Sequence, residues 1–146
     1  MLHPSPLPKY RGGSPIQNQI IRGEKDSAVT LFIMDGGIDT GDIIAQGYLS
    51  LDGNLNDIFN RMTKIGLKLT NEVLEGNFKK VKQNHSDATY FKRRKPSMSE
   101  ITVEEISTKS GEYLYNKIRM LQDPYPNAFI KTDDGKKLKI KLAELV

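Results

Sequence analysis

Two loops of this sequence carry side chains that can accept and donate protons. The first, Met1–Gly13, holds His3 among three prolines. The second, Asp35–Asp42, holds three carboxylates among three glycines and directly follows an apolar, strand-like run. An imidazole and a carboxylate that meet at the edge of one sheet form an acid–base pair. The rest of the chain is therefore interpreted as the scaffold that positions these two loops.

The carboxylate loop is compatible with more than one role. Its glycines let the backbone approach a ligand closely, so Asp35, Asp39 and Asp42 can act as a base or hold a metal. The alternative is a turn whose Asp side chains accept hydrogen bonds from their own backbone. A calcium loop is excluded, because no bidentate Glu follows at the position that such a loop requires. The residues alone leave the choice between a functional loop and a turn open.

The histidine loop is stiff, which favours a positioned ring. Its prolines fix φ and exclude regular structure. An imidazole held in such a loop loses little entropy when it engages a partner. A short helix is expected next, from Ser14, a good N-cap, to Gly23, which ends it.

Two strands and a long helix are expected after this short helix. Ala28–Met34 is apolar on both faces and predicts a strand that is buried from both sides. Ile43–Leu51 predicts a second strand with a bulge at Gly47. The short loop between them predicts a hairpin-like pair, so we expect a mixed rather than a wholly parallel sheet. Asn54–Glu75 carries an apolar stripe at helical spacing and predicts the clearest helix of the chain.

The last third of the chain is expected to form two helices and a hairpin. A capping-box pattern at Thr102 opens a short helix, and a second helix is predicted over Ser110–Leu121. Ala128–Lys131 and Lys137–Leu142 flank an Asp-Asp-Gly turn and predict a hairpin. Apolar residues alternate with lysines in the last strand, so one of its faces is predicted to be buried.

Composition limits the class of protein. The 146 residues suit one domain, and 37% hydrophobic with 27% charged residues is typical of a globular chain. The absence of cysteine excludes disulfides, thiolate metal sites and a cysteine nucleophile. No apolar run is long enough to cross a bilayer, and we expect a soluble, cytoplasmic protein without a metal or a membrane partner. The net charge of +4 reflects a basic cluster between Lys79 and Lys95, which favours a phosphate-bearing partner or is a solvated surface.

Three segments resemble the folate-dependent formyltransferases, the group that includes methionyl-tRNA and sugar-nucleotide N-formyltransferases. His3–Gly12, which reads His-Pro-Ser-Pro-Leu-Pro-Lys-Tyr-Arg-Gly, resembles the family signature, in which an Asn lies two residues before the His. Ile38–Ile44 also matches the family. Asp123–Phe129 resembles its Pro-Tyr-Pro-Gly-Ala segment, with Asn127 where Gly is usual. The three segments follow one another in the expected order.

The resemblance implies an Asn–His–Asp catalytic triad. His3 takes the His position and Asp39 the Asp position, whereas Met1 occupies the Asn position. The Asn of the family donates a hydrogen bond to the formyl oxygen, an oxyanion-hole role that methionine cannot fill. The half of the sheet that precedes the signature in the family is absent from this sequence. We therefore expect the C-terminal portion of a larger enzyme, as a natural truncation or a fragment, with impaired activity.

The resemblance also implies a donor and an acceptor. The donor is 10-formyltetrahydrofolate, whose pterin contacts the loop before the triad Asp. The residues implied at the folate are Met34, Asp35, Gly36, Gly37 and Ile38. The residues implied at the acceptor are Ser5, Tyr10, Arg11, Gly12, Arg93 and Arg94.

Two segments bear on the identity of the acceptor. Ala88–Pro96 is more similar to the Arg-Arg-x-Pro segment of sugar-nucleotide N-formyltransferases than to the Ala-Pro-Lys type of the methionyl-tRNA enzymes, and Gly13–Gln19 leans the same way. A nucleotide-linked amino sugar is therefore the favoured acceptor, and initiator methionyl-tRNA is the alternative. A non-catalytic remnant or binding module is the third interpretation.

The resemblance implies an α/β fold. This fold is the second half of a Rossmann-like formyltransferase domain, with a mixed sheet and flanking helices, followed by the start of a small C-terminal β domain. The expected parts are residues 1–95 for the catalytic half-domain, 96–129 for a helical connector and 130–146 for the truncated β domain. A homodimer is possible in this family.

Overall fold

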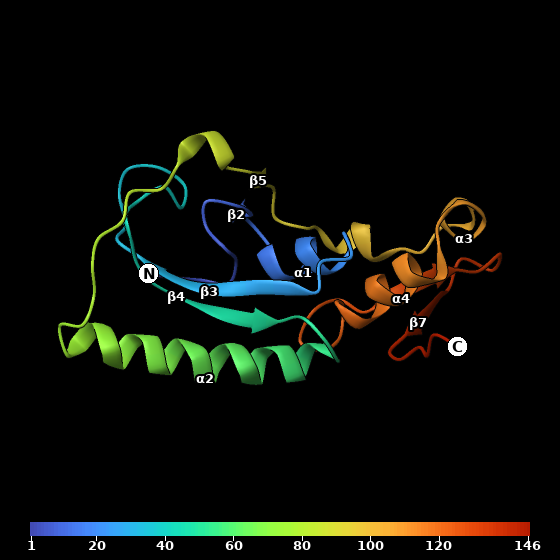
Figure 1. Cartoon of the computed structure of the whole chain (residues 1–146). Helices are drawn as coiled ribbons and strands as arrows, with labels where there is room; N and C mark the ends of the chain where they lie inside the picture. Colours follow the sequence, from blue (N-terminus) through green and yellow to red (C-terminus); the bar gives the residue numbers. More distant parts are fainter.

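The computed structural model describes all 146 residues, which form a layered α/β body with helices and a hairpin at one end (Figure 1). The strands are β1 (Leu2–His3), β2 (Arg11–Gly12), β3 (Asp26–Phe32), β4 (Ile43–Ser50), β5 (Tyr90–Phe91), β6 (Ala128–Lys131) and β7 (Lys137–Ile140). The α-helices are α1 (Pro15–Ile20), α2 (Leu55–Leu74), α3 (Val103–Thr108) and α4 (Gly111–Arg119). Short 3₁₀ turns occur at His85–Asp87 and Pro96–Ser99.

A three-stranded antiparallel sheet, in the order β1-β3-β4, is the centre of the fold. β3 pairs with β4 from Asp26 to Phe32. β1 pairs with the other edge of β3 and places His3 opposite Thr30. All residues of β3 except the first are buried, which confirms the strand expected to be covered on both faces from Ala28 to Phe32. Ile33 and Met34, expected in the same strand, lie beyond its end and are 41% and 69% exposed. Parallel pairing occurs between β2 and β5, which form a separate two-stranded ladder.

The bulge expected at Gly47 lies elsewhere. The register shifts between Leu31 and Phe32, whereas Gly47 is regularly paired opposite Val29. A Cβ atom at position 47 would lie 2.9 Å from Cγ2 of Ile65 on α2. Gly47 therefore permits the close approach of α2 to the sheet. A glycine inside a strand is typical of such an approach as well as of a bulge, so the sequence alone does not separate the two.

Two helices cover opposite faces of the sheet, α2 on one side and α1 on the other (Figure 1). Asn54 caps α2: its side chain accepts from the Asp57 N–H at 3.0 Å, and the Asp57 carboxylate accepts from the Asn54 N–H at 3.1 Å. Leu55, Ile58 and Leu69 of the predicted stripe are buried in one core cluster with residues of β3 and β4. This packing fixes the strands that position the two loops.

The start of α1 differs from the prediction. Ser14 precedes the helix, but its backbone is left-handed, with φ at 51°, and its side chain caps no helix N–H. Its Oγ accepts instead from the Arg94 N–H at 3.1 Å. Ser14 therefore ties the N-terminal loop to the basic segment that follows β5.

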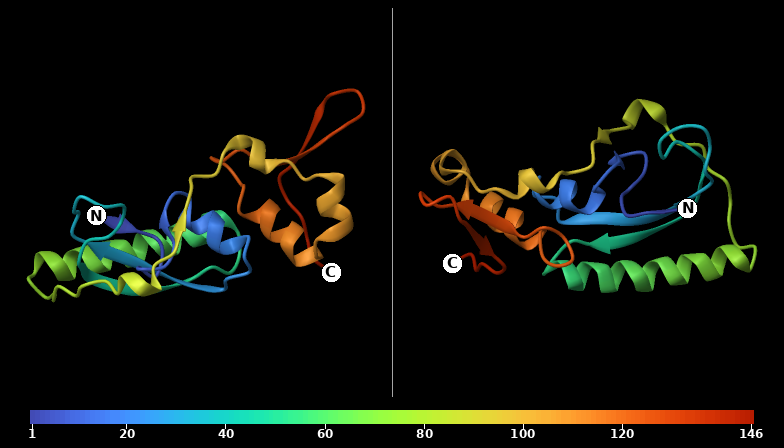
Figure 2. Two further views of the ribbon diagram at one scale, coloured as in Figure 1. Left: turned by 90° about the horizontal axis from the view of Figure 1, so that it is seen from above. Right: turned by 180° about the vertical axis from the view of Figure 1, so that it is seen from behind.

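α3, α4 and the β6–β7 hairpin lie together at the end of the molecule away from the N-terminus (Figure 2). The capping box at Thr102 is confirmed, because its Oγ1 accepts from the Glu105 N–H at 3.1 Å. The buried face predicted for the last strand is wrong: Leu138 and Leu142 are 59% and 79% exposed. β7 pairs only with β6, and of the alternating apolar residues only Ile140 is partly buried against the core. The boundaries expected after residues 95 and 129 stay predictions.

None of the helices combines the length and the apolar character that crossing a bilayer requires.

Candidate active site

His3 and Asp39 lie side by side. The His3 Nδ1 atom is 3.6 Å from the Asp39 Oδ2 atom, and the two side chains are only 6% and 12% exposed. His3 is held by the pairing of β1 with β3, and Asp39 lies in the loop that joins β3 to β4 (Figure 1). The structure thus brings together the two side chains that the sequence predicted to meet.

A backbone carbonyl orients the His3 ring. The His3 Nε2 atom is 2.8 Å from the Tyr10 oxygen. A carbonyl oxygen only accepts, so neutral His3 carries its proton on Nε2 and its lone pair on Nδ1. The ring nitrogen that carries the lone pair is therefore the one that faces Asp39.

Asp39 connects the two loops through a single oxygen. Its backbone is left-handed, with φ at 54°, a conformation that Asp and Asn tolerate better than most residues. Its Oδ2 accepts a hydrogen bond from the Gly12 N–H at 2.7 Å and also faces His3. The carboxylate is fixed in place by the same loop that carries the histidine.

Asp35 fills the turn role that the sequence left open. Its Oδ1 accepts from the Gly37 N–H at 3.0 Å and from the Thr40 hydroxyl at 2.5 Å. The Thr40 hydroxyl, more than any other group, lowers the pKa of Asp35. The loop therefore divides its carboxylates: Asp35 caps its own turn, and Asp39 reaches the other loop. No three His, Cys, Asp or Glu side chains gather in a geometry that would hold a metal ion.

A buried Arg–Gln pair clamps the Asp39 loop in place. Arg11 is fully buried, and its Nε and Nη2 donate to Gln83 Oε1 at 3.1 and 2.6 Å. The Gln83 amide nitrogen donates to the backbone oxygens of Asp39 and Gly41 at 3.0 and 2.7 Å. Sequence reasoning missed Gln83, because nothing in its spacing or neighbours distinguishes it from other polar turn residues.

The other polar residues implied at the acceptor are engaged inside the loop. Ser5 is buried, and its hydroxyl donates to the Lys9 oxygen at 2.7 Å. The Tyr10 hydroxyl donates to Glu24 at 2.7 Å, and burial together with this bond raises the pKa of Tyr10 to about 12. Ser5 thus stabilises the His3 loop from within, whereas Tyr10 and Arg11 tie this loop to Glu24 and Gln83.

Two adjoining cavities lie beside the paired side chains. The first has a volume of about 370 Å³, and its lining includes Pro4, Gly12, Arg93 and Tyr125. The second, of about 260 Å³, shares Arg93 and Tyr125 with the first and is also lined by Arg94. The structure thus places three of the residues implied at the acceptor around open space.

The residues implied at the folate form the exposed rim of the carboxylate loop. Met34 and Ile38 are 69% and 65% exposed. Met1, at the Asn position, is 60% exposed, and its amino group donates to the Phe32 oxygen at 2.7 Å. Residues two apart on an extended strand lie on the same side, so the side chain of Met1 is on the side of His3.

Comparison with known proteins gives a consistent result. Residues 1–74 match the family model described as formyl transferase. The methionyl-tRNA formyltransferase of Lachnospira eligens is 40% identical over 145 residues, which cover 95% of this chain and 44% of that protein. The solved methionyl-tRNA formyltransferase from Clostridium thermocellum matches with a TM-score of 0.82 at 38% identity, over 95% of this chain and 65% of that one.

A solved N-formyltransferase from Helicobacter canadensis, in complex with folinic acid and dTDP-3-aminofucose, matches with a TM-score of 0.67 at 28% identity. The match covers 82% of this chain and 45% of that one. The chain spans about half the length of the curated relatives it matches. The α/β formyltransferase fold implied by the three sequence segments is confirmed, and the chain belongs to the formyl transferase family.

Proposed function

We propose that this chain carries part of a site that transfers a formyl group from 10-formyltetrahydrofolate to a primary amine. The observation that carries the proposal is the pairing of His3 and Asp39, in which a basic ring nitrogen lies 3.6 Å from a carboxylate. Transfer to an amine needs such a pair, because the attacking nitrogen loses a proton and the leaving nitrogen gains one.

The two residues have different tasks in this reaction. As the amine attacks the formyl carbon, His3 stabilises the oxygen that becomes negative and relays a proton to the leaving nitrogen of the folate. Asp39 holds the ring in place and accepts the proton of the amine. The Tyr10 carbonyl, 2.8 Å from His3 Nε2, keeps Nδ1 directed at the carboxylate.

10-formyltetrahydrofolate supplies the formyl carbon, and the rim of the carboxylate loop is the proposed place for its pterin. Met34 and Ile38 expose apolar side chains there, on either side of two glycines. A Cβ atom on Gly36 would meet nothing within 4 Å, so the backbone at this position is open to a ligand. A flat ring system can pack on the side chains while it bonds to the backbone. The folinic acid in the Helicobacter canadensis relative supports a folate at this site.

The favoured acceptor is a nucleotide-linked amino sugar. Arg93 lines both cavities and Arg94 the second, and the first cavity reaches Gly12, whose N–H donates to Asp39. The volume of about 370 Å³ in the first cavity is within the range of small-molecule sites. The dTDP-3-aminofucose in the Helicobacter canadensis relative supports an acceptor of this class.

Methionyl-tRNA is the second candidate acceptor. The observation in its favour is sequence identity, because the Lachnospira eligens methionyl-tRNA formyltransferase is 40% identical to this chain, against 28% for the Helicobacter canadensis N-formyltransferase.

The two acceptors are separated by one assay. The chain is incubated with 10-formyltetrahydrofolate and either a panel of amino-sugar nucleotides or methionyl-tRNA, and formylated product is measured by mass spectrometry. We expect slow formylation of an amino-sugar nucleotide. Product from methionyl-tRNA alone would favour the second candidate. Product from neither acceptor, in this chain and in its Met1→Asn variant, would contradict the proposed function.

A further inference from the structure

A buried amide without a partner marks the two cavities beside the active site. Gln17, on α1, is 4% exposed, and its Nε2 atom is enclosed without a hydrogen-bond acceptor in the chain. Buried donors are nearly always paired, because an N–H taken out of water without a new acceptor is costly. Gln17 lines both cavities. The unpaired donor therefore points to a ligand that supplies the acceptor.

The same cavities have a cationic lining. Arg93 lines both, Arg94 and Lys95 line the second, and no Asp or Glu borders either one. The Arg94 guanidinium donates to the Met98 oxygen at 3.2 Å. Burial is the main cause that lowers the pKa of Arg94 and Arg22 lowers it further, while Tyr113 and Glu105 act in the opposite direction. A ligand that fits this lining carries negative charge.

The backbone of the basic segment is fixed against the start of α1. A Cβ atom on Gly13 would lie 2.5 Å from the Arg93 Cα, so only glycine allows this approach. The Gly13 N–H donates to the Phe91 oxygen at 2.8 Å, and the Arg94 N–H donates to Ser14 Oγ at 3.1 Å. The cations and the amide are thus held in a fixed arrangement around the cavities.

We propose that Gln17, Arg93, Arg94 and Lys95 form a subsite for the diphosphate group of the acceptor. Phosphoryl oxygens accept from amide and guanidinium N–H groups and bring the negative charge that the lining lacks. A carboxylate ligand would satisfy Gln17 but would leave most of the positive charge uncompensated. The inference rests on the proposed function, since it assigns the group to the same acceptor.

The first cavity leaves room for the remainder of that acceptor. It extends from Gln17 to Gly12 and is walled on another side by the rings of Phe59 and Tyr125, whose centroids are 6.1 Å apart. A diphosphate in the second cavity would therefore have its organic part in the first, next to the His3 loop. On this basis a nucleoside diphosphate is expected to bind more tightly than free pyrophosphate.

The subsite is tested by calorimetric titration of the chain with inorganic pyrophosphate at low ionic strength. Saturable binding at one site is expected. Gln17→Leu, which keeps the side-chain size and removes the donor, is expected to weaken binding about tenfold. It is also expected to raise the melting temperature, because the unpaired amide is gone. Arg94→Met is expected to weaken pyrophosphate binding at least as much. If the Gln17 variant does not fold, the affinity of the Arg94 variant is the test of the subsite.

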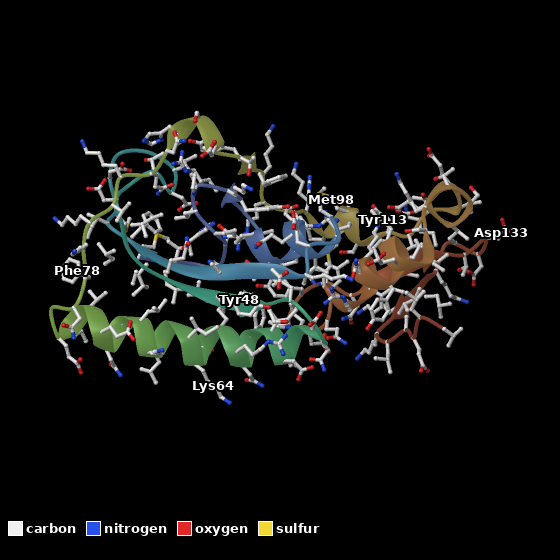
Figure 3. All side chains as sticks on the ribbon, viewed as in Figure 1. Tyr48, Lys64, Phe78, Met98, Tyr113 and Asp133 are labelled. Atoms are coloured by element: carbon white, nitrogen blue, oxygen red, sulfur yellow. The ribbon has the colours of Figure 1, made fainter.

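Lys64→Met is the matched control, because it removes one positive charge from the exposed face of α2, away from both cavities (Figure 3). Its pyrophosphate affinity is expected to equal that of the parent chain. The subsite is overturned if the parent chain does not bind pyrophosphate, or if Lys64→Met weakens binding as much as Arg94→Met. Tighter, Gln17-dependent binding of a short single-stranded RNA than of a nucleoside diphosphate would also overturn it.

The titration needs neither folate nor the His3–Asp39 pair. A chain that binds pyrophosphate in a Gln17-dependent way but transfers no formyl group would therefore overturn the proposed function and leave the subsite standing.

Discussion

One carboxylate oxygen does most to define the candidate active site. Asp39 Oδ2 accepts from the Gly12 N–H at 2.7 Å and lies 3.6 Å from His3 Nδ1. Residue type and spacing offer Asp35, Asp39 and Asp42 on equal terms, the family resemblance selects Asp39, and the fold places that residue beside His3. The residue at the third triad position is Met1, which cannot donate a hydrogen bond to a formyl oxygen.

Met1→Asn, made behind an added initiator methionine, is expected to raise the rate of formyl transfer on the order of 100-fold. The new amide would lie on the His3 side of β1 and supply an N–H donor for the developing oxyanion. Initial rates with saturating donor provide the measurement. Met1→Asp is the matched control, since it has the same size without the amide N–H. An equal gain in the Asp variant would show that the donor is not the cause.

The elements around the site act through contacts between loops. β1 and β3 place His3, but the loop of Asp39 is held by Gln83, which lies between two short elements far along the chain. Gln83 in turn accepts two hydrogen bonds from the buried Arg11, which has no ion-pair partner. The relative position of the two loops therefore depends on the Gln83 amide as well as on the sheet.

Gln83→Leu is expected to lower the free energy of unfolding by about 3 kcal/mol, since a buried and a part-buried carbonyl lose their donor and the buried Arg11 guanidinium loses the acceptor of two hydrogen bonds. Urea denaturation gives the value. Gln46→Leu, which removes an exposed amide that bonds Thr30, is the control and is expected to cost about 1 kcal/mol or less. Equal losses in the two variants would mean that the clamp adds no stability of its own.

Local sequence patterns predicted the elements better than the contacts between them. The apolar run of β3, the stripe of α2 and the capping box at Thr102 are local signals, and all three are found in the structure. The exposed face of β7 could not be foreseen, because alternation shows which residues share a face but not whether another element covers it.

The side chains that matter around the site were harder to predict. Gln17 and Gln83 are ordinary polar residues in the sequence, and their importance comes from tertiary burial. His3 and Asp39 were assigned because a family resemblance marked them, not because their spacing did. The catalytic role of each stays a prediction.

Across the whole molecule, the sheet body and the C-terminal helices meet at the cavities. Tyr125 and Pro126 follow α4, whereas Gln17 belongs to α1 on the sheet, and all three line the second cavity. The stability of the C-terminal part therefore bears on acceptor binding. An ion pair between Lys117 Nζ and Glu105 Oε2, at 2.7 Å and with both side chains largely buried, joins α3 to α4.

This ion pair predicts a loss of stability in acid. Burial raises the pKa of Glu105, but hydrogen bonds from Lys117, Thr102 and Tyr113 outweigh it and lower the pKa overall from 4.5. A pKa that is lower in the folded state stabilises the fold above the unfolded value. That stability is lost as the pH falls below about 4.5 and through the folded pKa.

Melting temperatures between pH 7 and pH 3 test this expectation. Glu105→Gln is expected to be less stable than the parent chain at pH 7 and to lose less on acidification. Parallel curves for the two proteins would show that Glu105 does not contribute to the acid sensitivity.

The most direct test of formyl transfer by the His3–Asp39 pair is the rate of product formation in an Asp39→Asn variant. Asn tolerates the left-handed backbone at this position, so the loop keeps its shape while the base is lost. We expect the transfer rate to fall on the order of 100-fold or more with the dissociation constant of the folate unchanged. A variant that transfers the formyl group as fast as the parent chain would contradict the assignment of this pair.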